Sequence, residues 1–401
     1  MHFNRIKEFK RIGFGLFVHF GLYSTIGCGE WYEHAYNVDK EKYEANISKF
    51  KVNKNWAKEL VKTAKALGAK YINITTRHHD GFSLYDTCGL SDFDAPHSAS
   101  HRDLIKEFVD ECNKEGIVPF FYHTLLDWHN PNYHNNFPKY IDYLIKSVKI
   151  LCKNYGKIGG FWLDGYWDKP NENWQFDRLY STIRKYQPEA IIINNTGLSA
   201  LGEVSHYEID AVTFERGKPF KISNTDNKDR AGEVCETLNE HWGYCENDIC
   251  YKSVPEIVDE FIDCRHFGCN FLLNVGLMGD GNIYPFEACL LKEVGKWVHN
   301  NSYLFNVHES SITSDAAYIF EDEEYYYAVI NNLHMFADEN VAKKALSKVI
   351  KINTNKTLYD LTYLDGDDRE IEYDRKDNSL ICLPFKYGQS LITRTIRFKV
   401  K

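Results

Sequence analysis

The feature that most constrains this chain is the repeated alternation of short apolar runs and helical patterns through its first two-thirds. The apolar runs predict buried strands at 14–20, 71–75, 117–122, 161–163, 190–193 and 271–275. Apolar residues at helical spacing predict helices at 56–67, 104–112, 140–151, 176–186 and 254–267. Strand, helix and strand in repeated order, joined by short connections marked with glycine, are typical of a parallel α/β architecture.

Polar and aromatic residues gather just after these strands, and this placement favours a (β/α)-barrel of the TIM type. Six or seven strand-helix units are visible rather than a regular eight, so irregularity in the barrel is left open. A doubly wound sheet is the alternative, but no GxGxxG phosphate loop opens the chain. From about residue 304 the segments alternate apolar and polar residues, which predicts a C-terminal antiparallel β-sandwich. We place the boundary near residue 302, between a barrel domain (1–302) and a sandwich domain (303–401).

Charge and cysteine content narrow the class of protein. The net charge of −9 argues against a polyanionic partner such as nucleic acid. The first residues contain no apolar run resembling a signal peptide, and no stretch is long enough to span a bilayer. The eleven cysteines are scattered, with no CxxC pair and no zinc-like spacing, which is typical of reduced thiols. We therefore expect a cytoplasmic protein with no membrane partner.

Asp164 is the leading candidate for the chemical centre. It ends the short apolar run Phe161-Trp162-Leu163, which reads as a fully buried parallel strand. Burying an unpaired carboxylate is costly, and barrel active sites lie at this end of the strands. A helix N-cap or turn aspartate is the alternative interpretation of the same residue.

Other strand ends carry histidines, tryptophans and carboxylates. The histidines are His19, His78, His79, His123 and His129, and the nearby tryptophans include Trp31, Trp128 and Trp162. Imidazoles donate and accept hydrogen bonds at neutral pH, while indole rings offer flat apolar faces. Hydroxyl-rich ligands with one apolar side need that combination, which indicates a sugar pocket. Two carboxylates in such a pocket fit glycoside hydrolysis, in which one attacks the anomeric carbon and the other protonates the leaving oxygen.

A metal site is the rival interpretation of the same histidines. Adjacent residues of an extended segment point to opposite sides, so at most one of His78 and His79 points along a given face there. Beyond the strand end that restriction weakens. Neither an HxH pair nor an HExxH motif is present to sharpen the case. A metal-dependent barrel hydrolase remains an alternative.

Several motifs resemble those of the α-L-fucosidases of glycoside hydrolase family 29. The matching stretches include His78-His79-Asp80-Gly81 and lie at 14–24, 30–32, 77–82, 102–104, 122–129, 155–165, 242–244, 251–253 and 268–281. They follow one another in collinear order across most of residues 11–300. The resemblance implies a (β/α)-barrel with a C-terminal β-sandwich, a carbohydrate substrate ending in α-L-fucose, and a retaining two-step mechanism that uses neither metal nor cofactor.

The resemblance also implies roles for individual residues. Asp164 takes the position of the nucleophile. For the acid/base we rank Glu215 first and Glu233 second, with Glu30 as a supporting residue. The positions implied or expected to hold the sugar are His19, Glu30, Trp31, His78, His79, Tyr122, His123, Trp128, His129, Trp162, Arg216 and Trp242.

One departure from the family pattern leaves the substrate open. Many members read Asn-Asn-Arg where this chain reads Asn194-Asn195-Thr196. Arg216 is a candidate to supply the missing charge. The alternatives are a glycosidase for a galactose-configured relative of fucose, and a carbohydrate-binding relative that has lost catalysis. For the sandwich domain, three roles stay open: supporting the barrel, binding glycan, and mediating contacts in a homo-oligomer.

Overall fold

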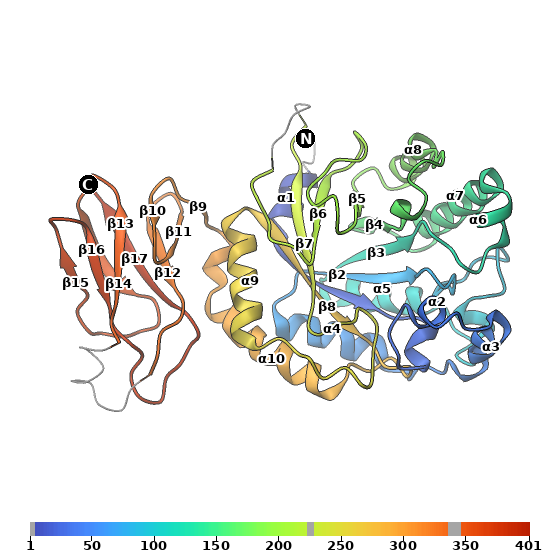
Figure 1. Cartoon of the computed structure of the whole chain (residues 1–401), viewed down its shortest axis with the longest axis horizontal. Helices are drawn as coiled ribbons and strands as arrows, with labels where there is room; N and C mark the ends of the chain where they lie inside the picture. Colours follow the sequence, from blue (N-terminus) through green and yellow to red (C-terminus); the bar gives the residue numbers. More distant parts are fainter. Residues whose placement is uncertain (1–4, 223–227, 336–345) are drawn as a thin grey trace. The chain divides into compact units, whose positions relative to one another are not determined.

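The computed structural model describes residues 5–222, 228–335 and 346–401. The first four residues, on which the expectation of no export signal partly rests, lie outside that range. The chain divides into two compact units, one formed by Met1–Lys252 with Cys269–Lys296 and the other by Ser253–Gly268 with Trp297–Lys401. Each unit is built around its own β-structure (Figure 1).

The first unit is a closed barrel of eight parallel strands in sequential order. The strands are β1 (Phe14–His19), β2 (Tyr71–Arg77), β3 (Val118–Thr124), β4 (Gly160–Asp164), β5 (Ile191–Asn194), β6 (Ala211–Glu215), β7 (Ala231–Thr237) and β8 (Cys269–Gly276). The barrel closes where β1 pairs with β8, with Phe14 opposite Phe271. The predicted (β/α)-barrel is confirmed, and β6 and β7 are the two strands that the apolar pattern did not indicate.

Helices lie around the outside of these strands (Figure 1). The longer ones are α4 (Trp56–Leu67), α5 (Leu104–Glu115), α7 (Phe137–Asn154), α8 (Phe176–Tyr186) and α10 (Pro285–Asn300), and the short ones are α2 (Tyr32–Ala35), α3 (Lys40–Glu44) and α6 (Pro131–Asn135). Helix α4 buries Trp56, Leu60 and Val61 and ends at Gly68, whose φ of +90° suits a residue without Cβ. Across the described residues, no helix is both long and apolar enough to cross a membrane.

A short N-terminal helix, α1 (Arg5–Ile12), packs against the buried cluster inside the barrel. Its Phe9 ring lies 5.6 Å from the rings of Tyr71 and Phe120, which are near the starts of their strands. The same cluster includes Trp162, further along β4. The barrel interior is therefore filled with side chains at its N-terminal end, which leaves the C-terminal end for a site.

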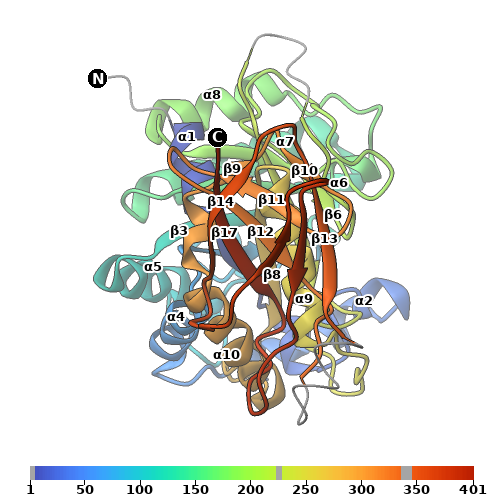
Figure 2. The ribbon, with the colours of Figure 1, turned by 90° about the vertical axis from the view of Figure 1, so that its left-hand side faces the viewer.

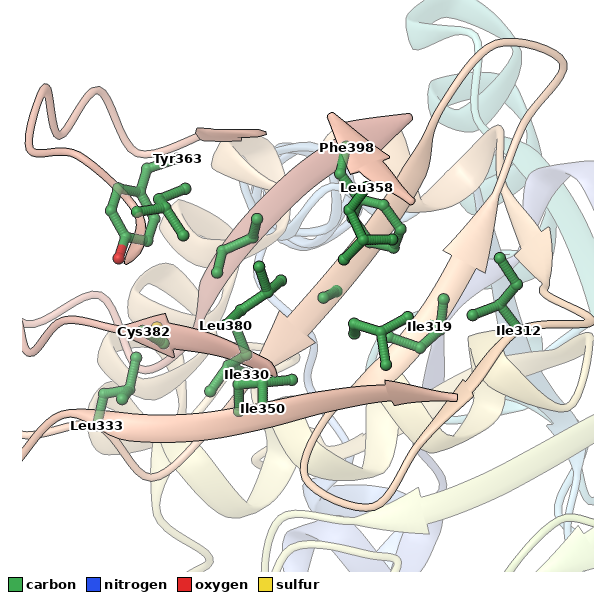
Figure 3. Close-up of a cluster of buried hydrophobic side chains, with 14 of the residues drawn as sticks. Ile312, Ile319, Ile330, Leu333, Ile350, Leu358, Tyr363, Leu380, Cys382 and Phe398 are labelled. Atoms are coloured by element: carbon green, nitrogen blue, oxygen red, sulfur yellow. The ribbon is translucent and has the colours of Figure 1, made fainter. Parts of the chain in front are cut away.

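The second unit contains two antiparallel sheets, as predicted for a sandwich. One sheet has the order β10 (Thr313–Ser314), β13 (Lys348–Asn353), β16 (Ser379–Cys382), β15 (Glu372–Asp374), and the other β14 (Leu358–Tyr363), β17 (Arg394–Val400), β12 (Tyr326–Ile330), β11 (Tyr318–Glu321), β9 (His308–Glu309). Figure 2 shows β14, β17 and β12 next to one another. Buried residues from both sheets, among them Ile350, Leu380, Ile330 and Phe398, form one core (Figure 3).

Helix α9 (Val254–His266) belongs to this second unit, although it lies in the sequence between the barrel strands β7 and β8. The hydroxyl of Tyr318 donates to Asp263 Oδ1 at 2.5 Å, and Asn331 Nδ2 donates to Asp259 Oδ1 at 3.2 Å. The boundary expected near residue 302, between a barrel domain and a sandwich domain, stays a prediction.

Candidate active site

A small cavity opens among residues at and beyond the carboxyl ends of the barrel strands, and aromatic and titratable side chains line it. The lining residues are Phe17, His19, Trp31, His78, His79, Tyr122, Trp162, Asp164, Trp167, Asn195, Glu215 and Trp242. Strands β1, β3, β4 and β6 and the segments that follow β1, β2, β4, β5 and β7 all contribute. The parallel barrel thus brings residues from across more than two hundred positions to one place.

Asp164 ends β4 and accepts hydrogen bonds on both of its carboxylate oxygens. Tyr122 Oη donates to Oδ2 at 3.0 Å, while Trp167 Nε1 and Asn195 Nδ2 each donate to Oδ1 at 3.1 Å. His79 Nε2 lies 3.6 Å from Oδ2. Only 9% of the residue is exposed. Donors on three sides hold the carboxylate in one orientation, which a nucleophile requires.

Asn195 joins the two candidate catalytic carboxylates. Its Nδ2 donates to Glu215 Oε2 at 2.7 Å as well as to Asp164 Oδ1 at 3.1 Å. Thr213 Oγ1 donates to Asn195 Oδ1 at 2.8 Å and fixes which way the amide faces. Because one nitrogen reaches both oxygens, they lie at most about 6 Å apart, the two hydrogen-bond lengths added together. A retaining pair of carboxyl groups is separated by about 5–5.5 Å and an inverting pair by about 6.5–9.5 Å.

The environment of Glu215 favours its protonated form. Burial, followed by the nearby negative charge of Asp164, raises the pKa of Glu215 to about 7. The hydrogen bond from Asn195 opposes this shift only in part. At neutral pH the site can therefore hold one carboxylate that accepts hydrogen bonds and one carboxylic acid able to give up a proton.

The histidines of the cavity are neutral at physiological pH. Burial lowers the pKa of His19 to about 3 and that of His79 to about 4, and it brings the pKa of His78 well below the ordinary range. Within the described ranges, no group of three or more His, Cys, Asp or Glu side chains is arranged to hold a metal ion.

Partners outside the cavity determine which nitrogen of His19 and His79 carries the proton. Asn274 uses Nδ2 to donate to the Trp242 carbonyl, so its Oδ1 accepts from His19 Nδ1 at 2.7 Å. Thr124 donates its hydroxyl to the Leu126 carbonyl, so its oxygen accepts from His79 Nδ1 at 2.7 Å. In both rings Nε2 is left as an acceptor for a hydroxyl of a ligand.

Aromatic rings supply the apolar part of the cavity. Tyr122 and Trp162 stack at 5.6 Å, and Phe17 lies 5.2 Å from Trp162 and 5.8 Å from Trp242. Trp31 lies 5.5 Å from His79 and so combines a flat face with a neighbouring polar ring. This combination of rings and neutral imidazoles suits a sugar that has one apolar side.

Four further predicted residues lie around the cavity rather than in its lining. Glu30 is buried and accepts a hydrogen bond from the Gly243 amide at 2.7 Å. The Arg216 guanidinium lies 5.3 Å from the ring of the lining residue Trp242 and donates to the Glu240 carbonyl. Trp128 stacks on His34 at 5.0 Å and lines a neighbouring pocket, and His129 stacks on Phe93 at 4.4 Å.

Two other predicted residues are fully buried away from the cavity. His123 follows Tyr122 in β3, so alternation along the strand turns it to the opposite face, where it bonds Thr76 and Ser147. Glu233 lies near the start of β7 rather than at its end, and its two oxygens accept from Tyr71 Oη and Trp162 Nε1. These positions place His123, which was expected to line the sugar pocket, and Glu233, the second choice for the acid/base, outside the cavity lining.

Phe17 and Asn195 line the cavity without having been predicted. Asn195 lies two residues beyond the predicted strand 190–193. This position at a strand end is the feature of the sequence that could have identified it as a site residue. The next residue, Thr196, donates its hydroxyl to the Ala200 carbonyl.

Comparisons with known proteins agree on one family. The family model described as alpha-L-fucosidase matches residues 4–303. The tissue alpha-L-fucosidase of Rattus norvegicus is 26% identical over 327 residues, which cover 74% of this chain and 68% of that protein. The structure of alpha-L-fucosidase isoenzyme 1 from Paenibacillus thiaminolyticus is 28% identical, with a TM-score of 0.85 over 99% of both chains. A GH29 alpha-L-fucosidase from Bacteroides thetaiotaomicron, 22% identical, shares the fold with a TM-score of 0.82 over 100% of this chain and 96% of its own.

Proposed function

Since the chain belongs to the α-L-fucosidase family, we propose that it is a retaining exo-glycosidase that releases terminal α-L-fucose from oligosaccharides or glycoconjugates, with Asp164 as nucleophile and Glu215 as acid/base. The observation that supports the two assignments is the shared contact with Asn195, which keeps the two carboxylate oxygens within about 6 Å of each other, below the separation of an inverting pair. The raised pKa of Glu215 supports its assignment as the proton donor, with Asp164 as the nucleophile.

In the first step, Asp164 attacks the anomeric carbon as the bond from that carbon to the leaving oxygen breaks. Glu215 gives its proton to the leaving oxygen, so the aglycone departs as a neutral alcohol. The product is a glycosyl ester on Asp164 with the configuration at the anomeric carbon inverted. Loss of the Asp164 charge then lowers the pKa of Glu215, and that residue is left as a carboxylate.

In the second step, Glu215 removes a proton from an incoming water whose oxygen attacks the same carbon. The ester bond to Asp164 breaks and the carboxylate returns. A second inversion restores the original configuration, and reprotonated Glu215 completes the cycle. We assign the Nε2 atoms of His19 and His79 to sugar hydroxyls, and the rings of Phe17, Trp162 and Trp242 to the apolar side of the sugar.

The roles are tested by chemical rescue of two variants. Asp164→Gly should abolish turnover of an aryl α-L-fucoside, and azide should restore it with β-fucosyl azide as product, because azide attacks from the side that the carboxylate left. Glu215→Ala should keep activity only toward an activated aryl leaving group, and azide should then give α-fucosyl azide from the glycosyl-enzyme. Rescue of Asp164→Gly that yields the α-anomer would reject the nucleophile. An α-azide product from Glu233→Ala but not from Glu215→Ala would reverse the acid/base assignment.

Thr196, in place of the arginine that many members carry, motivates a second candidate, a glycosidase for a galactose-configured sugar. A screen of aryl glycosides with fucose, galactose and arabinose configurations separates the two candidates by kcat/KM. Sugar binding in calorimetry without turnover of any of these substrates would instead indicate a binding protein. Activity that survives exhaustive chelation would remove the metal-dependent alternative.

A further inference from the structure

Two cysteines face each other across neighbouring backbone segments beside the site. Cys28 and Cys245 form an antiparallel β-bridge. The flanking amides make its hydrogen bonds, with Gly29 N donating to Tyr244 O at 3.0 Å and Glu246 N donating to Gly27 O at 2.9 Å. This pattern makes the cysteines a non-hydrogen-bonded pair, in which the Cα atoms are about 4.5 Å apart and the side chains project to the same side.

That spacing fits a disulfide without movement of the backbone. Disulfide-linked cysteines have Cα atoms about 4.4–6.8 Å apart, and cross-strand pairs of this type lie at the short end of the range. Cys28 is exposed and Cys245 is half-buried, and both are free thiols. The two segments are also in close contact elsewhere, since a Cβ added to Gly29 would lie 2.7 Å from His241 Cδ2.

We propose that Cys28 and Cys245 are a thiol–disulfide modification site, at which a reversible cross-link joins the two loops that flank the active site. One loop carries Glu30 and Trp31, and the other carries Trp242 and Gly243. The amide of Gly243 already donates to the Glu30 carboxylate at 2.7 Å, so the cross-link would add a covalent bond to an existing contact. Because Trp31 and Trp242 both line the cavity, the modification fixes two of its walls relative to each other.

A small disulfide such as glutathione disulfide is the oxidant. The exposed Cys28 thiolate attacks one of its sulfurs, the sulfur–sulfur bond breaks, and a glutathione thiolate leaves. Burial raises the pKa of the Cys245 thiol, which suits it to act second. Its thiolate attacks the Cys28 sulfur of the mixed disulfide and releases a second glutathione thiolate. The two protons lost by the cysteines are taken up by the two glutathione molecules, so two thiols are oxidised and one disulfide is reduced.

The cross-link closes a loop of more than two hundred residues in a geometry that the reduced chain already has. We therefore expect slower heat inactivation in the oxidised protein, because the unfolded chain loses more freedom than the folded one. Because the cross-link leaves the folded geometry unchanged, kcat and KM for an aryl fucoside should stay close to those of the reduced protein.

Peptide mapping of the full chain tests the proposal directly. The protein is equilibrated in glutathione buffers from reducing to oxidising, alkylated, and digested with trypsin and a glutamate-specific protease. This digestion isolates Cys28 in peptide 12–30 and Cys245 in peptide 241–246, apart from Cys235 and Cys250. We expect these two peptides to appear linked under oxidising conditions, with loss of two of the eleven thiols. An oxidised protein that keeps all eleven thiols, or that links Cys245 to Cys250 instead, would overturn the proposal.

Variants give the matched controls. Cys28→Ser and Cys245→Ser should each abolish the linked peptide and the slower heat inactivation under oxidising conditions. Cys289→Ser, at another exposed cysteine, should retain both. If Cys28→Ser kept the gain in heat resistance, the cross-link would not be its cause. Mapping of the unmodified chain needs no variant and decides the matter even if a substitution impairs folding.

Discussion

Asn195 is the residue that links the two proposed catalytic carboxylates, Asp164 and Glu215. Its single amide nitrogen contacts both of them, while Thr213 and the Gly197 amide hold its oxygen. An amide cannot change its charge, so it can stay in place while the proton on Glu215 leaves and returns. We therefore regard Asn195 as a positioning residue for both steps of the reaction.

Replacing Asn195 by Ala should lower kcat/KM by about 10- to 100-fold, which corresponds to one or two hydrogen bonds to charged groups. The pH profile should change as well. The amide lowers the pKa of Glu215, so its removal should move the basic limb of kcat/KM to higher pH. Thr196→Ala is the control, because that hydroxyl donates to the Ala200 carbonyl and its loss should leave the limb in place. An unchanged limb in Asn195→Ala would contradict the positioning role.

The pH dependence of the wild-type enzyme follows from Glu215. Its pKa is about 7 and the first step requires its proton, so kcat/KM should fall as the pH rises through about 7. Glu215→Ala should lose this basic limb for an activated aryl fucoside, which needs no proton donor. A wild-type profile that stays flat up to pH 9 would show that Glu215 is not the acid.

Among the elements, β7 places the carboxylate of Glu233 inside the barrel rather than at the site, where it was predicted as the second choice for the acid/base. Glu233 is fully buried, and burial raises its pKa to about 7 from the ordinary 4.5. The folded state therefore holds the proton more tightly than the unfolded state does. This difference stabilises the folded state by up to about 3 kcal/mol. The contribution is fully present below about pH 4.5, decreases as the pH rises, and is lost above about pH 7.

Glu233→Gln should remove this contribution, because a Gln amide does not titrate. Urea unfolding at pH 5 and pH 8 should give a smaller stability difference in the variant than in the wild type. Glu233→Ala should cost about 3–5 kcal/mol at pH 5, since it leaves a cavity and two unpaired donors, the Tyr71 hydroxyl and the Trp162 indole. At pH 8 the cost should be smaller, because the wild type has itself lost stability through ionisation of Glu233. Equal pH dependence in the wild type and Glu233→Gln would mean that Glu233 does not titrate in this range.

The elements that the sequence predicts well are those with strong periodicity. Helices 56–67 and 176–186 have the predicted limits, because an apolar stripe and a clear stop signal mark each of them. Strands β6 and β7 were missed, since Thr213 and Glu215 in one and Glu233 in the other interrupt the apolar run. Those polar residues serve the site and the barrel interior, and only the closed barrel shows which direction they face.

Most of the predicted site residues that line the cavity lie on or just after strands that were also predicted. Residues at recognised strand ends, such as His19 and Asp164, line the cavity. Glu233 was placed by local resemblance alone, in a strand whose position was unknown, and it lies deeper in the barrel. Asn195 carries no charge, and its role depends on its contact with Glu215 of β6, which no single stretch of sequence contains.

At the scale of the whole molecule, α9 groups with the C-terminal strands through contacts such as those of Asp263 with Tyr318 and Asp259 with Asn331. A chain ending at residue 302 would lose both partners. We expect such a chain to aggregate or to melt without cooperativity, which size-exclusion chromatography and thermal denaturation would show. The double variant Tyr318→Phe, Asn331→Ala removes only the hydrogen bonds and should melt within a few degrees of the full chain. A monomeric, cooperative and active 1–302 chain would establish the boundary near residue 302 as that of an independent domain.

The pairing of β1 with β8 has a consequence for synthesis on the ribosome. Phe14 meets Phe271, so the first strand of the barrel cannot find its second neighbour until the eighth has been made. At about 5–20 residues per second, that delay is on the order of ten seconds or more. During this interval β1 presents an unpaired edge in the nascent polypeptide, where a holding chaperone would protect it. The rate of translation between β1 and β8, rather than strand propensity, then determines how long the nascent chain is prone to aggregation.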